Sequence, residues 1–166
     1  IGIDACRENL MDISRRALAN TLFVIANAQA LPSELYGLAA HISINFPWGS
    51  LIEGLLNGDE SLLAGLRAVS RPNAALEVRL NGGALAEAGW PLDEGAARVQ
   101  AVLAANGFAV RQPKVMLAHE LKQFPTTWAK RIAYGRDPRA MLLAGVRQGD
   151  VVREKEVYGD MQVGNR

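Results

Sequence analysis

The sequence has 166 residues, 49% of them hydrophobic, and a formal net charge of +1. Length and apolar content suit roughly one globular domain with a buried core, and the near-neutral total gives no sign of nucleic-acid binding. The single cysteine, Cys6, excludes an internal disulfide and a zinc site built on a cysteine pair, so we expect a reducing, cytoplasmic compartment. No apolar stretch reaches the about 20 residues of a membrane span, and we expect no membrane association.

The chain opens on Ile1-Gly2-Ile3-Asp4, a pattern typical of the inside of a buried strand, with no initiator methionine. We therefore expect the natural protein to continue upstream. A carboxylate at a strand end fits the ribose hydroxyls bound by nucleotide-binding α/β folds, although a turn or cap is the more frequent role of such an aspartate. Apolar residues at helical spacing then predict an amphipathic helix over 7–18.

Two apolar runs predict the next strands, at 22–25 and 41–46. Small and amide residues follow the first run at 26–29, where a planar base could lie against the backbone; an ordinary turn is the alternative. Trp48 follows the second run, between a proline and a glycine. An aromatic ring there is poorly placed to fill a core and well placed to line a cleft at the carboxyl end of a strand. The alternative for Trp48 is a partly buried aromatic.

The rest of the chain continues to alternate. Ser50, Ser61 and Asp93 are predicted helix caps, residues 81–83 a flexible loop, and residues 119–134 a helix interrupted at Pro125. Further strands are predicted at 75–80, 110–116 and 141–146. This order predicts an α/β fold with a doubly wound sheet that ends in an antiparallel strand pair. We assign residues 1–148 to one domain and residues 149–166 to a charged tail.

Basic residues gather in the C-terminal half, where residues 111–139 hold a local excess of five positive charges. This predicts a basic surface, with an ordinary solvated face as the alternative. His41 and His119 lack metal-binding spacing, so no metal is expected. Nucleophile elbows and Walker loops are absent.

Several stretches, in order over residues 1–148, resemble the Kam/NpmA family of 16S rRNA (adenine1408-N1)-methyltransferases, which confer aminoglycoside resistance. They are Ile1-Gly2-Ile3-Asp4 with Glu8-Asn9-Leu10, Leu22-Phe23-Val24-Ile25-Ala26, Phe46-Pro47-Trp48-Gly49-Ser50, Gly107-Phe108, and Thr127-Trp128-Ala129-Lys130-Arg131 through Gly135-Arg136. The resemblance implies a Rossmann-like class I methyltransferase fold, S-adenosylmethionine as cofactor and 16S rRNA in the 30S subunit as partner. We expect a monomer.

The resemblance also implies roles for individual residues. Trp48 and Trp128 would sandwich a flipped-out adenine, although Trp128 taken alone fits a core residue of an amphipathic helix better. Arg136 and Arg139 would brace the flipped nucleotide or meet rRNA phosphates. The implied cofactor-binding residues are Asp4, Ala26, Asn27, Ala28, Phe46 and Pro47, and the implied RNA-binding residues are Arg15, Arg16, Lys130 and Arg131.

The implied methyl transfer depends on the placement of the two reactants more than on activation of either one. Adenine N1 has an available lone pair and the sulfonium methyl is already activated, so alignment is the main demand and no catalytic acid or base is assigned.

Two features of the family do not occur in the sequence. One is the glycine-rich cofactor loop with its first strand, and the other is a basic loop between Leu18 and Leu22. Two alternatives therefore stay open: a methyltransferase for another RNA site, and a non-catalytic RNA-binding or ribosome-binding module.

Overall fold

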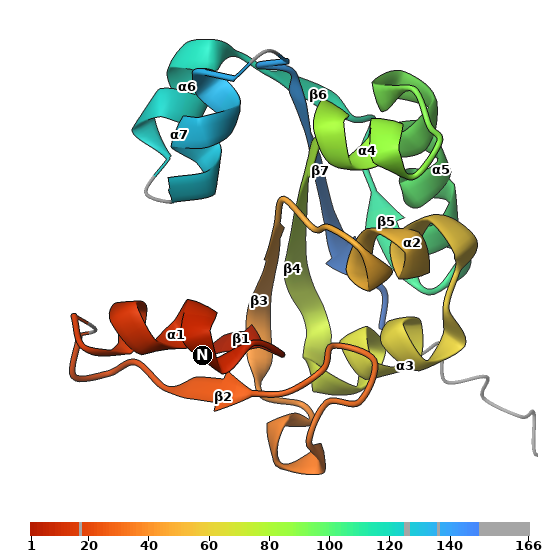
Figure 1. The fold of residues 1–166 in the computed structure, drawn as a ribbon. Coiled ribbons are helices and arrows are strands. Elements are labelled where there is room, and N and C mark those ends of the chain that lie inside the picture. Colours follow the sequence, from red (N-terminus) through yellow and green to blue (C-terminus); the bar gives the residue numbers. More distant parts are fainter. Residues whose placement is uncertain (17, 125–126, 136, 150–166) are drawn as a thin grey trace, which may run out of the picture.

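The computed structural model describes residues 1–16, 18–124, 127–135 and 137–149, without the side chains of residues 12, 127 and 128 (Figure 1). The predicted tail over 149–166 therefore lies outside the described residues, apart from its first position. The domain boundary at residue 148 stays a prediction.

Strands and helices alternate along most of the described chain. The strands are β1 (Gly2–Asp4), β2 (Phe23–Ile25), β3 (Ala39–Asn45), β4 (Ser70–Asn81), β5 (Phe108–Val110), β6 (Lys114–Met116) and β7 (Ala140–Arg147). The helices are α1 (Arg7–Ser14), α2 (Ser50–Asn57), α3 (Glu60–Val69), α4 (Gly82–Glu87), α5 (Leu92–Ala105), α6 (Ala118–Gln123) and α7 (Thr127–Ala133), with a short 3₁₀ turn at Ser33–Leu35. The predicted α/β class is confirmed.

The strands form two sheets. The larger has the order β3-β4-β7-β5, with β6 also paired to β7. In it β3 and β4 are parallel, whereas β7 runs antiparallel to β4, β5 and β6, which is the antiparallel ending that the sequence predicts. Strands β1 and β2 form a separate parallel pair. The alternation of elements predicts one sheet, whereas the described residues form two. Alternation indicates which strands exist but not which strands are neighbours, and no strand among the described residues joins β1 to β3.

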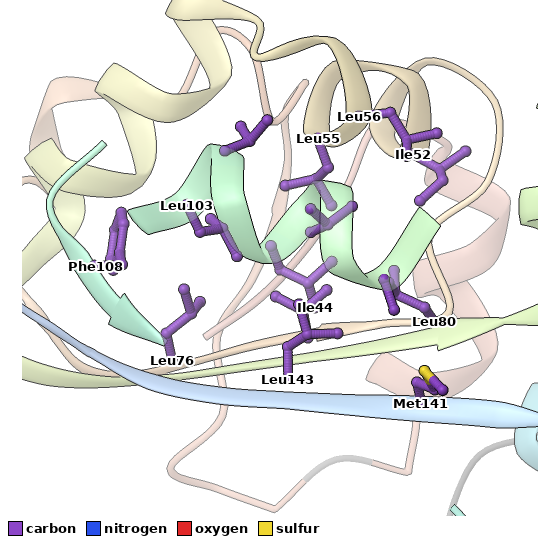
Figure 2. Close-up of a cluster of buried hydrophobic side chains, with 14 of the residues drawn as sticks. Ile44, Ile52, Leu55, Leu56, Leu76, Leu80, Leu103, Phe108, Met141 and Leu143 are labelled. Atoms are coloured by element: carbon purple, nitrogen blue, oxygen red, sulfur yellow. The ribbon is translucent and has the colours of Figure 1, made fainter. Parts of the chain in front are cut away.

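The main core lies between the larger sheet and the helices on one of its faces. Figure 2 shows side chains of α2 and α5, among them Leu55 and Leu103, facing Leu76, Leu80 and Leu143 of the strands. A second, smaller cluster lies under α6 and α7. Its buried members are Phe46, Met116, Leu121, Ala129, Ile132, Ala133 and Ala140.

The predicted helix caps are wrong by one or two residues. Helix α2 begins after Gly49, which makes no side-chain cap, and α5 begins after Pro91. Helix α3 is capped by Asp59, whose Oδ1 accepts a hydrogen bond from the Leu62 amide at 2.8 Å. Only α3 has a polar side-chain cap among these three helices, and it is Asp59 instead of the predicted Ser61. Shifts of one or two residues are common at helix ends.

The predicted flexible loop at 81–83 is instead the cap and first turn of α4. Asn81 Oδ1 accepts a hydrogen bond from the Ala84 amide at 2.8 Å, and Ala84 and Leu85 are buried. Each helical glycine costs roughly 1 kcal/mol relative to alanine. Burial of the apolar side chains that follow Gly82 and Gly83 offsets this cost, and tertiary packing thus overrides the local glycine signal.

We expect Leu103→Ala to lower the free energy of unfolding by about 2 to 5 kcal/mol, because truncation of a fully buried leucine leaves a cavity in the main core. Urea denaturation followed by circular dichroism measures this change. Leu18→Ala is the matched control, since Leu18 is 76% exposed, and should change stability by less than about 0.5 kcal/mol. Equal effects of the two substitutions would contradict the packing described for α5.

Candidate functional site

The first part of the site is the carboxyl end of the β1–β2 pair. Asp4 pairs in register with Ile25, and the Ala26 amide donates a hydrogen bond to the Asp4 carbonyl at 3.1 Å. Asp4 and the segment 26–28 therefore lie side by side, as expected for the ends of neighbouring parallel strands. Ala26 and Ala28 are half-buried and Asn27 is exposed.

The Asp4 carboxylate is held in one orientation by its neighbours. Oδ1 accepts a hydrogen bond from the Cys6 amide at 2.8 Å, and the Asn9 amide nitrogen lies 3.2 Å from both carboxylate oxygens. Asp4 thus fixes the turn into α1, which is the structural role considered for it. Each carboxylate oxygen has two lone pairs, so acceptor capacity also remains for two hydroxyl donors.

A shallow depression of about 250 Å³ lies where the loop after β2 meets α2 and α3. Gln29 Nε2 donates a hydrogen bond to Asp59 Oδ2 at 3.2 Å, which ties this loop to the start of α3. Gln29 was not predicted from the sequence to have a separate role, because an amide in a turn carries no specific signal. The residues that line the depression are Gln29, Ser50, Glu53, Gly54, Asn57 and Asp59.

Phe46 turns the chain at the carboxyl end of β3. Its φ of 53° lies in the left-handed region, which non-glycine residues rarely adopt. Such a conformation costs on the order of 1 to 3 kcal/mol and persists only where the surroundings hold it. Here the Phe46 amide donates to the Arg79 carbonyl at 2.8 Å, and its buried ring meets Phe124 edge to face at 6.0 Å. Pro47 is buried directly after it.

Trp48 emerges from this corner and is 42% exposed. Its indole Nε1 donates a hydrogen bond to Glu87 Oε1 of α4 at 3.2 Å. The placement matches the sequence-based expectation of an aromatic ring at a strand end that does not fill the core.

Arg79 braces the same corner from β4, and sequence reasoning missed it. Its guanidinium bonds Glu77 Oε2 at 2.7 Å and Asn45 Oδ1 at 3.1 Å, and lies 4.7 Å from the centre of the Phe124 ring. The hydrogen bond from Arg79 is the main reason that the pKa of Glu77 is below its usual value. The alternation of polar residues along the two strands was the available signal, because alternate residues share a face.

Helix α7 packs against this corner through Ala129, Ile132 and Ala133, which share the smaller cluster with Phe46. The structure therefore brings the helix that carries Trp128 next to the segment that carries Trp48. The Trp128 side chain lies outside the described residues, as does Arg136.

Arg139 lies just before β7 and is bound by Asp137. The guanidinium Nε and Nη2 lie 2.8 and 2.9 Å from the two carboxylate oxygens. The Arg139 side chain is 68% exposed, and its carbonyl accepts a hydrogen bond from the Gly82 amide at 3.2 Å. Arg139 is thus fixed beside the first turn of α4.

The remaining predicted RNA-binding residues lie on two different elements. Arg15 and Arg16 are exposed at the end of α1, and Lys130 and Arg131 are exposed on α7. Within the described part of the chain, no group of three or more histidine, cysteine, aspartate or glutamate side chains could hold a metal ion. None of the described helices is long and apolar enough to cross a membrane.

Several solved structures with a similar fold are methyltransferases. An antibiotic-related methyltransferase matches with a TM-score of 0.71 and 30% identity, over 89% of this chain and 74% of that one. A 16S rRNA (adenine(1408)-N(1))-methyltransferase from Catenulisporales acidiphilia, solved with its cosubstrate SAM, has a TM-score of 0.75 over 90% of this chain and 75% of its own, at 23% identity, and supports the fold alone. The fold is that of an α/β methyltransferase.

The sequence comparisons identify the family. A family model described as NpmA, 16S rRNA (adenine(1408)-N(1))-methyltransferase, matches residues 1–147. A protein of that name from Escherichia coli is 36% identical over 157 residues, which cover 82% of this chain and 70% of the relative. The chain belongs to the NpmA family of methyltransferases, which confirms the resemblance drawn from its motifs.

The Asp137–Arg139 pair leads to a testable prediction about the pKa of the Asp137 carboxyl. Hydrogen bonds from Arg139 hold the pKa of the Asp137 carboxyl below its usual value. The ionised carboxylate therefore favours the folded state above the unfolded pKa of about 3.9, and this contribution is lost as the pH falls through the lower folded value. In Arg139→Ala we expect the pKa of Asp137 to rise toward its usual value, measured by carbon NMR of the carboxyl. Arg111→Ala is the control, and an unchanged titration in Arg139→Ala would contradict the pairing.

Proposed function

We propose that this chain transfers the methyl group of S-adenosylmethionine to N1 of an adenine in the 16S rRNA of the small ribosomal subunit. Family membership supports the reaction, and the names of the relatives specify adenine 1408 of 16S rRNA. The observation that carries the proposal is the half-exposed Trp48 at the carboxyl end of β3, held beside α7 by the Phe46 corner. Within this proposal, the protein acts as a monomer and without a metal ion. Its substrate is the ribosome in the cytoplasm.

The cofactor side would be the end of the β1–β2 pair. The Asp4 carboxylate is already oriented by the Cys6 amide and Asn9, and two acceptor oxygens suit the two hydroxyls of a ribose. The half-buried Ala26 and Ala28 offer small side chains against which an adenine could lie, and Asn27 follows the same strand. Phe46 and Pro47 would border the cofactor from the β3 side. The residues present thus fit S-adenosylmethionine, which supplies an activated methyl group when bound.

The substrate side would be made by the two tryptophans. Stacking on an aromatic side chain stabilises a base by about 1 to 3 kcal/mol, which is comparable to the few kcal/mol needed to unstack it from RNA. Trp48 and Trp128 would hold the flipped adenine between them. No acid or base is needed, because N1 has a free lone pair and the reaction depends on alignment.

The basic residues would bind the RNA backbone. Arg139 is exposed and fixed by Asp137 beside the substrate side, and we place Arg136 in the same role. Lys130 and Arg131 on α7, and Arg15 and Arg16 after α1, are exposed cations that suit phosphate contacts away from the base.

The reaction itself is tested by primer extension. Small subunits incubated with the natural protein and S-adenosylmethionine should give a reverse-transcription stop at adenine 1408, because N1 methylation blocks base pairing. A stop at another base would assign a different RNA target, and no stop at all would contradict the proposal and favour a non-catalytic binding module.

The stacking roles are tested by truncation of each tryptophan. Trp48→Ala and Trp128→Ala should each abolish most methylation and leave the affinity for S-adenosylmethionine within about threefold, because both residues are assigned to the substrate base and neither to the cofactor. Calorimetry measures the cofactor affinity. Trp90→Phe, at the third tryptophan of the chain, is the control and should methylate normally. Parallel losses of cofactor binding and methylation would make the residues structural.

A further inference from the structure

We propose that Glu87 and Gly83 of α4 are positioning residues for Trp48, and that they hold its indole in one orientation before the substrate base arrives. This inference rests on the function proposed above for Trp48. It assigns a role in the reaction to α4, which carries none of the site residues predicted from the sequence.

One face of α4 contacts both ends of the indole. The pyrrole Nε1 donates a hydrogen bond to Glu87 Oε1 at 3.2 Å. At the other end, a Cβ placed on Gly83 would lie 3.6 Å from Trp48 Cη2 and 3.9 Å from Cζ3, so the six-membered ring lies directly over the glycine. Gly83 and Glu87 are four residues apart and therefore share a helix face.

The helix that makes these contacts is firmly anchored. Ala84 and Leu85 are 2% and 0% exposed, on the core side of α4. Asn81 caps the helix through the Ala84 amide at 2.8 Å. Leu85 also packs closely on α5, since a Cβ on Gly95 would lie only 2.7 Å from Leu85 Cδ2. The helix behind Trp48 is thus anchored in the main core through its opposite face, which contains Leu85.

A fixed indole matters because Trp48 is otherwise exposed. An exposed aromatic side chain exchanges among rotamers, and each would present a different plane to the base. Because the ring is already ordered in the free protein, binding of the base does not have to pay the conformational entropy of ordering it. It also sets the plane of the adenine, on which alignment of N1 with the methyl carbon depends. The Glu87 carboxylate would repel RNA phosphates, so its charge gives RNA binding no direct benefit.

The first test compares Glu87→Ala with Glu87→Gln. Loss of the acceptor should lower kcat/KM for the small subunit by on the order of ten- to a hundredfold, as a misplaced reacting group does. The glutamine Oε1 still accepts the indole hydrogen bond, so Glu87→Gln should restore most of the activity. Affinity for S-adenosylmethionine and Tm should stay at wild-type values in both. Glu94→Ala, which removes an exposed carboxylate from α5, is the charge-matched control.

A second perturbation acts on the other end of the ring. Gly83→Leu places a bulky side chain where the six-membered ring now lies, and should reproduce the loss seen in Glu87→Ala without weakening cofactor binding. Two changes at opposite ends of the indole then report on the orientation of the same ring.

The orientation of the indole is measured directly by fluorescence. With Trp48 as the sole tryptophan, after Trp90→Phe and Trp128→Phe, Glu87→Ala should raise acrylamide quenching and lower anisotropy, and Glu87→Gln should not. This readout needs no methylation, so it separates failure of this inference from failure of the proposed function. The inference is overturned if Glu87→Ala leaves Trp48 fluorescence and methylation unchanged, if it weakens cofactor binding and methylation equally, or if Glu87→Gln is as inactive as Glu87→Ala.

Discussion

The left-handed backbone at Phe46 is the constraint on which the site depends. A residue in this conformation redirects the chain abruptly at the carboxyl end of β3, and it is retained only because the Phe46 ring is buried in the cluster under α6 and α7. The same packing therefore does two things. It points Trp48 out of the sheet, and it brings α7, with Trp128, to the place where Trp48 emerges.

The second support comes from the main core. Helix α4 is only six residues long, too short to be stable alone, so its geometry is set by the leucine that it buries. That burial links the interior of the protein to the orientation of an exposed ring. One face of α4 buries Leu85 in the core, and the opposite face is the surface against which the Trp48 indole lies. Packing in the core therefore sets the position of this part of the site.

The sequence was sufficient for the fold class and for the candidates on strand ends, because those follow from apolar periodicity and from short motifs around Trp48. It did not predict helix α4 or the role of Arg79 at the Phe46 corner. Two consecutive glycines indicate a loop by local rules, and only the three-dimensional burial of Leu85 reverses this. Arg79 is an alternating residue of a strand, and its importance comes from Phe124, which lies far away in the sequence. The sequence also did not predict that β1 and β2 pair only with each other, because the order of strands along the chain does not determine which strands are neighbours in space.

The contact between Gly82 and the segment 137–139 has a mechanical consequence. The Gly82 amide bonds the Arg139 carbonyl, and a Cβ at Gly82 would overlap Asp137 Oδ2. The backbone that carries an exposed cation is thus joined to the first residue of the helix that contacts Trp48. In the proposed function, an RNA phosphate bound by Arg139 would act through this hydrogen bond on the helix that contacts Trp48. Binding of the RNA backbone and orientation of the base would then be coupled steps.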